Sequence, residues 1–376
     1  MLDSIIFHNF KTFSDQSIPL RSLTLLTGVN GTGKSSVLQA LAMLRQSFDA
    51  GFLIGGAWLL NGELIELGTG RDVAFEDSAD DLISITVGGF DRSNAANKII
   101  EISVVDRKSN DDVLWETTPG RREPGRWSQL AAFDVGFQYL RADRITPAVT
   151  FPKSQHAIQT RRFLGSRGEF SPHYLLEYGE DDIPCRTLIR NEEEFSGRLL
   201  SQVNAWLQEL SPGVRVDVEN VPMTDLVRLE FAFRTRGPAY GGPFRPTNVG
   251  FGLTHALPVL VGCLGARPGN LLLIENPEAQ LHPQGQIAIG GLLAKLSAAG
   301  VQVIVETHSD HILNGIRLAV RNGDLSADQA AFHFFSRNDS AKVTLQSPKI
   351  DENGLLSEWP SGFFTQWDDA LVELLR

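Results

Sequence analysis

The stretch that decides the fold reads Gly28-Val29-Asn30-Gly31-Thr32-Gly33-Lys34-Ser35-Ser36. An apolar run, Leu23–Leu26, precedes it, and a run of good helix formers, Val37–Leu44, follows it. The local order is therefore strand, glycine loop and helix, and the loop fits the pattern G-x-x-x-x-G-K-[ST] of a phosphate-binding loop. A glycine turn that only caps a helix is the alternative, but the complete motif in this context favours a nucleotide site.

Each part of the loop has a chemical purpose in that reading. Glycines allow the backbone to turn its N–H groups inward around an anion, and the N-terminus of the following helix adds positive dipole. The Lys34 ammonium can reach the β- and γ-phosphates, and the Ser35 hydroxyl can ligate Mg²⁺. The residues expected to bind the phosphates are Asn30, Gly31, Thr32, Gly33, Lys34, Ser35 and Ser36.

Composition sets the bounds for the rest of the chain. Its 376 residues suffice for two or more domains, and 42% hydrophobic residues suffice for a buried core. No apolar run reaches the roughly 18 residues of a membrane span, and the N-terminus has no basic region before its apolar stretch. The two cysteines, Cys185 and Cys263, lie far apart, so we expect neither a disulfide framework nor a cysteine metal site. These features predict a cytoplasmic protein without a membrane partner.

Net charge bears on the possible partners. The formal net charge is −11, whereas a dedicated DNA-binding domain is usually basic. Nucleic acid stays open as a partner only through local basic clusters, for which a solvated surface is the favoured interpretation. These clusters are Arg121, Arg122 and Arg126; Arg161, Arg162 and Arg167; and Arg228, Arg234, Arg236 and Arg245.

A second chemical feature is a carboxylate that directly follows an apolar strand. Leu271–Ile274 reads as a buried strand, and Glu275 comes next, followed by Asn276, Pro277 and Glu278. A strand delivers such a side chain to the carboxyl edge of a parallel sheet, where ligands bind. There Glu275 could hold Mg²⁺ directly or through water. An ordinary strand-to-helix turn is the alternative, but the phosphate loop in the same chain favours the metal role.

Two further segments have the same character. Val301–Val305 is again a buried strand, and it leads to Glu306-Thr307-His308-Ser309-Asp310, where His308 could contact a γ-phosphate or the attacking water. A histidine with a structural role is the alternative. Asn248–His255 is a small-residue turn before an apolar helix, and N–H groups at a helix start can bind phosphate, although a plain N-cap fits as well. Its candidate phosphate-binding residues are Gly250, Gly252 and Thr254.

The order of elements predicts an α/β protein in which an interrupted nucleotide-binding fold carries an inserted lobe. We expect the first part of the head at 1–90, an inserted mixed lobe at 91–245, the second part of the head at 246–340 and a C-terminal extension at 341–376. Parallel strands from both ends of the chain then share one sheet. Further expectations are antiparallel strands within 72–117, an amphipathic helix over 191–210, a helix from Pro283 to Gly300 and another within 310–322.

Taken together, these segments resemble the ABC-type ATPase heads of the RecF, SMC and OLD-like group, in particular a prokaryotic AAA-family branch with compact heads. The matching segments are Asn9–Phe13 for the N-terminal strand pair, Gly28–Ser35 for Walker A, Val249–Thr254 for a divergent signature motif, Leu271–Pro283 for Walker B and Glu306–Ser309 for the histidine switch. The tail, Ile350–Gly354 through Trp359–Phe364, is similar to a C-terminal domain of unknown function. The fold that this resemblance implies is a P-loop NTPase head with a mixed sheet flanked by helices and an inserted α+β lobe.

The resemblance also implies a mechanism. Two heads face each other, each ATP lies between the Walker A of one subunit and the signature motif of the other, ATP closes the dimer and hydrolysis opens it. Many relatives carry a second acid directly after the Walker B carboxylate as the water-activating base, and Asn276 occupies that position here. An amide cannot accept the proton, so Glu278 or His308 substitutes, or hydrolysis is slow.

Several functions are compatible with this head. The first is an ATPase dimer, or a higher oligomer, that controls a separate effector protein, as in bacterial anti-phage or toxin–antitoxin-like systems. The second is a DNA-repair ATPase, against which stand the acidic charge and the missing coiled coil. The third is an ATP-gated scaffold or sensor with little turnover, which Asn276 favours. A transporter motor ranks last, and the short stretch 309–376 argues against a built-in nuclease.

Overall fold

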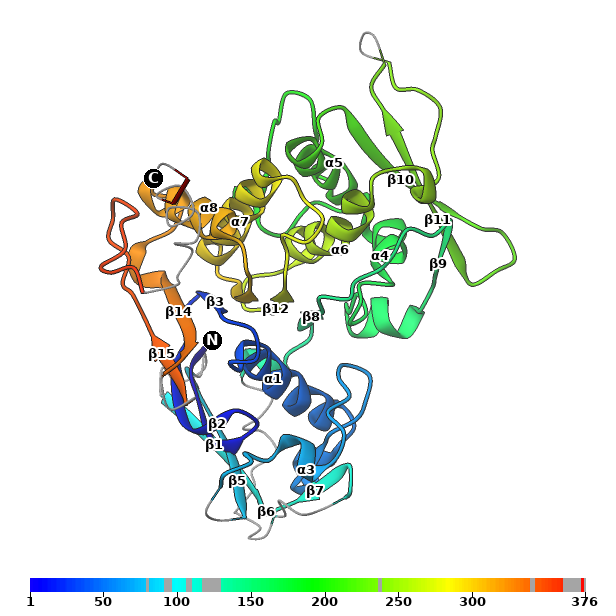
Figure 1. Cartoon of the computed structure of the whole chain (residues 1–376). Coiled ribbons are helices and arrows are strands. Elements are labelled where there is room, and N and C mark those ends of the chain that lie inside the picture. Colours follow the sequence, from blue (N-terminus) through cyan, green and yellow to red (C-terminus); the bar gives the residue numbers. More distant parts are fainter. Residues whose placement is uncertain are drawn as a thin grey trace. The chain divides into compact units, whose positions relative to one another are not determined.

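The computed structural model describes residues 1–78, 81–90, 97–105, 110–116, 130–235, 239–338, 342–360 and 373–374. The basic cluster around Arg121 and the end of the expected tail motif, 361–364, lie outside these residues. The chain forms two compact units (Figure 1). The first unit comprises 1–134, 330–351 and 356–376, and the second comprises 135–329 and 352–355. These units reflect backbone packing, and the four-segment division expected from the motifs stays a prediction.

An antiparallel sheet forms one part of the first unit, in the strand order β2-β1-β5-β6. Its strands are β1 (Leu2–Phe10), β2 (Phe13–Pro19), β5 (Leu82–Phe90) and β6 (Asn97–Val105). Phe7 stacks on Phe10 and on Phe13, at ring-centroid distances of 5.5 and 5.1 Å, and all three rings are buried. The antiparallel strands expected within 72–117 are confirmed, because β5 pairs with β6 and β4 (Ala57–Leu59) pairs with β7 (Val113–Trp115).

A second sheet segment of the first unit carries the phosphate loop. Strand β3 (Leu23–Gly28) pairs in parallel with β14 (Ala330–Arg337), and β15 (Val343–Gln346) pairs antiparallel with β14. Strands from the two ends of the chain therefore lie side by side, as the sequence predicts (Figure 1). The helices of this unit are α1 (Lys34–Asp49), α2 (Phe52–Gly55) and α3 (Gly70–Val73).

The second unit contains the parallel strands β8 (Gln138–Leu140), β12 (Leu271–Glu275) and β13 (Gln302–Glu306). Strand β12 lies between the other two, and it pairs with both in parallel. The apolar side chains of β12 and β13 are fully buried, as expected for a parallel sheet covered by helices. The helices are α6 (Phe251–Gly265), α7 (Pro283–Ala298) and α8 (Asp310–Arg321), so the expected helices from Pro283 and within 310–322 are confirmed.

Helices α7 and α8 pack with their backbones in contact (Figure 1). A Cβ atom added to Gly290 would lie 2.4 Å from the carbonyl oxygen of Ile312, and one added to Gly315 would lie 2.3 Å from that of Ile287. The side chain of Ser309, which caps α8, also donates a hydrogen bond to Oε1 of Gln286 in α7 at 2.5 Å. These contacts hold the two helices together at their crossing and near the start of each.

A three-stranded antiparallel sheet with two helices completes the second unit. The strands are β9 (Thr150–Pro152), β10 (Val214–Asn220) and β11 (Leu226–Phe233), and the helices are α4 (Ser171–Tyr178) and α5 (Leu199–Leu210). Single helical turns lie at Ala131–Phe133, His156–Thr160, Arg186–Leu188, Pro246–Asn248 and Ala327–Gln329.

The helix expected over 191–210 is wrong in its first part, because α5 begins only at Leu199. The backbone before it pairs elsewhere: the amide of Ile183 donates to the carbonyl of Gly197 at 2.9 Å, and the amide of Leu199 donates to the carbonyl of Asp181 at 2.8 Å. Asn191 has a φ of 49°, which also interrupts a helix. The second part behaves as expected, with Val203, Trp206 and Leu207 in the core.

The described residues thus form a mixed α/β protein whose sheets are flanked by helices. No helix among them is both long and apolar enough to cross a membrane.

Candidate functional site

The phosphate loop joins β3 to α1 in the first unit. Gly28 ends β3 with a φ of 134°, opposite Phe335 of β14, and the amide of Val29 donates to the carbonyl of Phe335 at 3.0 Å. Gly31 and Gly33 have φ values of 74° and 97°, in the left-handed region that favours glycine. Helix α1 begins directly after the loop, at Lys34. A glycine loop that runs into a helix N-terminus fits a bound phosphate chain, because unpaired helix N–H groups meet the anion there.

The Lys34 side chain lies inside this loop. It is 3% exposed, and its Nζ donates a hydrogen bond of 2.8 Å to the carbonyl oxygen of Val29. The Thr32 hydroxyl donates to the same carbonyl at 2.7 Å. A phosphate oxygen carries negative charge and is therefore a stronger acceptor for the ammonium than this neutral carbonyl. The geometry places Lys34 ready to exchange the carbonyl for a phosphate.

Two other segments of the first unit support the loop. The Arg337 guanidinium, at the end of β14, donates from Nη2 to the carbonyl of Gly31 at 2.9 Å. A Cβ atom on Gly33 would lie 2.4 Å from the Thr12 hydroxyl and 2.5 Å from the Phe13 ring. A cavity of about 510 Å³ lies beside them, lined among others by Lys11, Thr12, Phe13, Phe75, Glu76 and Arg337. This volume falls in the usual range for small-molecule sites.

In the second unit, Glu275 ends β12 with both carboxylate oxygens engaged. The buried Tyr139 hydroxyl donates to Oε1 at 2.6 Å, and the amide of Ala142 donates to Oε2 at 2.9 Å. Burial and the neighbouring Glu275 charge hold the pKa of Tyr139 well above its usual value, so it stays a donor. Each carboxylate oxygen keeps a lone pair, which leaves Glu275 fixed in orientation and still able to ligate a hard cation such as Mg²⁺.

The turn after Glu275 brings the other predicted residues together. The amide of Asn276 donates to the carbonyl of Glu306 at 2.8 Å, and its φ of 43° is unusual for a residue other than glycine. Glu278 accepts from the amide of His308 at 2.9 Å through Oε1, while its Oε2 is buried with no hydrogen-bond partner among the described residues. His308 itself is exposed. The structure therefore places Glu275, Glu278 and His308 at one end of β12 and β13.

The three residues predicted at the start of α6 differ in their surroundings. Gly250 has open space around it, and Gly252 packs closely, since a Cβ there would lie 2.3 Å from the carbonyl oxygen of Gln280. Thr254 is fully buried, and its hydroxyl has no partner in the described part of the chain. A phosphate contact through the main chain at Gly250 is open to a ligand, whereas one through the Thr254 hydroxyl needs α6 to move. The three roles stay predictions.

Three residues that the sequence reasoning missed belong to these clusters: Tyr139, Arg144 and Arg337. Tyr139 and Arg144 lie at the end of β8 and in the turn after it, which is the same signal of a strand leading into polar residues that pointed to Glu275. Arg337 is found only through the pairing of β14 with β3. In the described part of the chain, no group of three or more His, Cys, Asp or Glu residues is placed to hold a metal ion.

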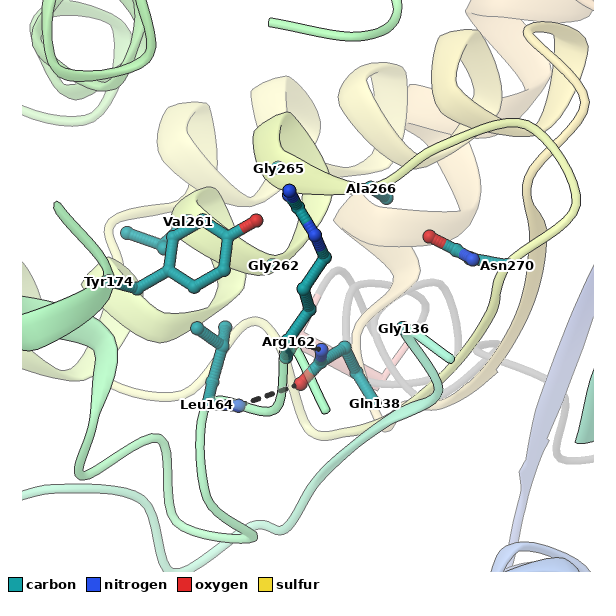
Figure 2. Close-up of a pocket in the computed structure, with 10 residues that line it drawn as sticks. All are labelled: Gly136, Gln138, Arg162, Leu164, Tyr174, Val261, Gly262, Gly265, Ala266 and Asn270. Carbon is teal, nitrogen blue, oxygen red and sulfur yellow. Dashed lines mark hydrogen bonds between the residues drawn. The ribbon is translucent and has the colours of Figure 1, made fainter. Parts of the chain in front are cut away.

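A small cavity in the second unit lies near the first residues of β8 and β12, at the ends of these strands away from Glu275 (Figure 2). Gly136, just before β8, and Asn270, just before β12, line it together with Arg162 and Tyr174. Its volume is about 10 Å³, which is room for roughly one water molecule. This cavity cannot hold a nucleotide, so the ends of β12 and β13 that carry Glu275 and Glu306 remain the candidate site of this unit.

The fold and these clusters define an ABC- and SMC-like ATPase head. The chain belongs to the family described as "AAA domain, putative AbiEii toxin, Type IV TA system", whose model matches residues 23–314. Residues 325–374, which include β14 and β15, match a family described as a protein of unknown function, DUF3696. The head and the C-terminal region that the sequence led us to expect are thereby confirmed. The comparison with curated proteins found no match.

Two solved structures show the same fold. One is an SMC head bound to the C-terminal winged-helix domain of ScpA, with 15% identity and a TM-score of 0.54, covering 93% of this chain and 98% of that one. The other is an SMC head domain with an extended coiled coil, bound to the C-terminal domain of ScpA derived from Pyrococcus furiosus. It has 14% identity and a TM-score of 0.54 and covers both chains completely.

Proposed function

We propose that this protein binds ATP with Mg²⁺ and hydrolyses it slowly, and that it uses the cycle to control a separate effector protein. The observation that carries the proposal is the phosphate loop with its buried lysine. Lys34 is 3% exposed, and its Nζ donates a hydrogen bond of 2.8 Å to the carbonyl oxygen of Val29. The family match adds that the chain is built as an ATPase. The loop residues Asn30–Ser36 bind the phosphates, and the neighbouring cavity of about 510 Å³ accepts the nucleoside.

Each predicted residue has one task in this function. Lys34 neutralises the β- and γ-phosphates. The resemblance to ABC-type heads makes Ser35 and Glu275 the expected ligands of Mg²⁺, which when bound would offset the charge that develops on the phosphoryl oxygens. Tyr139 and the amide of Ala142 keep the Glu275 carboxylate in one orientation. His308 is exposed and contacts the γ-phosphate. The second oxygen of Glu278 has no hydrogen-bond partner among the described residues, which supports Glu278 as the carboxylate that takes the proton Asn276 cannot.

The class of head supports a proposal for the oligomer and the partner. We propose a homodimer in which ATP lies between the phosphate loop of one subunit and Gly250, Gly252 and Thr254 of the other. The solved relatives are SMC heads bound to domains of ScpA, which supports a protein partner for this head too. The toxin–antitoxin description of the family supports a bacterial defence or toxin–antitoxin-like setting, in the cytoplasm, with the damage done by another chain.

A second function is favoured by one residue. Asn276 stands where an acid would activate the water, and its side-chain oxygen is buried without a hydrogen-bond partner in the described structure. A dimer of such heads can bind ATP, close and stay closed, which makes it an ATP-gated scaffold rather than an enzyme with steady turnover. A DNA-repair role fits the SMC-like fold less well, because the chain has a net charge of −11.

Steady-state ATP hydrolysis by the purified chain, combined with its mass in solution with and without ATP, tests the proposal. We expect slow turnover that is lost in Lys34→Ala, Glu275→Gln and His308→Ala, and a mass that doubles with ATP. Glu278→Gln keeps the shape of the side chain and removes only the basic carboxylate, so it separates catalysis from packing. Doubling without turnover favours the gated scaffold. ATP affinity that is unchanged in Lys34→Ala refutes the site.

A further inference from the structure

Three segments of the second unit meet on the side chain of Arg144. This residue lies in the turn after β8 and is 2% exposed. Its Nε donates to the carbonyl of His255 in α6 at 3.2 Å, and its Nη1 donates to the carbonyl of Glu275 at 2.5 Å. Its Nη2 donates to the carbonyl of Asn276 at 2.7 Å. A further bond from Nη1 to the carbonyl of Arg141, at 3.1 Å, closes its own turn.

The chemistry of these contacts is unusual for a buried cation. Every acceptor is a main-chain carbonyl, so the guanidinium holds backbone positions rather than a single partner side chain. Burial lowers the pKa of Arg144 to about 10, and the charges of Glu278, Glu275 and Asp143 act in the opposite direction. The group therefore remains protonated at neutral pH. A buried charge is retained at such a place only when it is well hydrogen-bonded, and the four carbonyls engage four of the five N–H donors of the guanidinium.

The backbone that Arg144 holds is the part most relevant to the chemistry. Asn276 has a φ of 43°, a conformation that surrounding contacts must maintain. Its amide is bonded to Glu306 and its carbonyl to Arg144, so the peptide is fixed at both sides. The same turn that carries Arg144 also supplies the Ala142 amide to the Glu275 carboxylate at 2.9 Å. The remaining contact, to His255, lies in the first half of α6, shortly after Gly250 and Gly252.

We propose that Arg144 is a positioning residue that ties the Glu275–Asn276 turn to α6. It fixes where the Glu275 carboxylate presents itself to Mg²⁺, and it transmits a displacement of α6 to that carboxylate. This role rests on the proposed function, because it assumes that Glu275 ligates the metal of a bound nucleotide. It adds a named connection between the start of α6 and the end of β12, both within the second unit.

The variant Arg144→Lys isolates the role. A lysine keeps the charge and much of the stem, but its single ammonium cannot reach carbonyls on three segments as the planar fork of arginine does. Arg141→Lys in the same turn is the matched control. The Arg141 side chain is partly exposed and pairs with Asp143 at 2.9 Å, and a surface ion pair of this kind contributes little to stability.

Two measurements on the full chain decide the matter. The first is native-state hydrogen exchange at the amides of Ala142 and Asn276, with amides in the middle of α7 as the reference. The second is ATP binding at a series of Mg²⁺ concentrations. In Arg144→Lys we expect exchange about tenfold faster or more at Ala142 and Asn276, less than about a twofold change in α7, and several-fold more Mg²⁺ for half-maximal binding. Arg141→Lys leaves both readouts near those of the unaltered chain.

The outcomes separate this inference from the proposed function. Equal acceleration at the turn and in α7 means a general structural role, and it overturns the inference. Faster exchange at the turn with an unchanged Mg²⁺ requirement overturns it as well. If the unaltered chain binds no ATP, the proposed function has failed, and the exchange pattern alone then decides whether Arg144 positions the turn.

Discussion

Replacing Gly28 by alanine tests how the phosphate loop is seated on β14. A Cβ atom at Gly28 would lie 2.0 Å from the carbonyl oxygen of Phe335 and 2.7 Å from its amide nitrogen. Both are backbone atoms of a paired strand, so no flexible side chain can move aside. The φ of 134° adds strain for any residue with a side chain. Gly28→Ala therefore has to displace either the loop or β14.

The magnitude follows from these two terms. Placing an L-residue at positive φ costs roughly 1–2 kcal/mol, and forcing a methyl group into filled space costs typically about 1–3 kcal/mol. We expect Gly28→Ala to lower the free energy of unfolding of the first unit by about 3–5 kcal/mol, including the bond from Val29 to Phe335. Gly31→Ala is the matched control, because its φ is 74° but a Cβ there meets nothing within 4 Å. It bears the strain alone, roughly 1–2 kcal/mol.

Hydrogen exchange of the β3 and β14 amides, measured in both variants, gives the two free energies. The difference between the variants is the quantity that matters, because both place alanine at a positive φ and only Gly28→Ala also meets backbone atoms. Equal losses in Gly28→Ala and Gly31→Ala, or a loss below about 1 kcal/mol in Gly28→Ala, would refute the reasoning from backbone contact.

Three further outcomes are expected. Tyr139→Phe removes only the hydroxyl that donates to Glu275 at 2.6 Å, so the free energy of unfolding of the second unit should fall by about 1.5–3 kcal/mol. Hydrogen exchange of the β12 amides measures this change, and an unchanged value contradicts the role of that bond. Burial and a neighbouring guanidinium lower the pKa of His255 to about 4. Below about pH 6.5 the imidazole takes up a proton in the unfolded chain but not in the folded one, so the free energy of unfolding falls as the pH drops from about 6.5 toward 4. That loss amounts to at most about 3 kcal/mol, and urea unfolding of His255→Gln across this range should show a shallower pH dependence than the unaltered chain. Arg337→Ala frees the Gly31 carbonyl, and titration with ATP should show roughly 2–10-fold weaker binding; equal affinity argues against a supporting role.

The sequence predicts the elements that carry the chemistry because their signals are local. The phosphate loop needs glycines, a lysine and a following helix within one short stretch, and Lys34 indeed begins α1. Glu275 follows four apolar residues and Glu306 follows three, which marks the end of a buried parallel strand. In the structure the two glutamates lie opposite each other in the parallel pair of β12 and β13.

The rest depends on contacts between distant segments. Arg144 becomes part of the site because its carbonyl partners at 255, 275 and 276 come together in the fold. Arg337 reaches the phosphate loop only through the pairing of two strands some 300 residues apart. The missing first turns of α5 have the same cause, since backbone bonds from 181 and 183 compete for the residues before Leu199. Phe195 has helical spacing with Leu199 and Val203, but spacing alone does not reveal that other backbone groups compete for this segment.

The glycines at the crossing of α7 and α8 give the candidate site a mechanical property. With Gly290 and Gly315 the two helices touch backbone to backbone, so they have no layer of side chains between them that could deform. Ser309 follows His308 directly and is bonded to Gln286 near the start of α7. If His308 contacts the γ-phosphate as proposed, a displacement of His308 would therefore be transmitted to a closely packed pair of helices rather than to one loop. Under the proposed function, the outer surface of this helix pair is therefore a place where an effector protein could sense the bound nucleotide without contacting it.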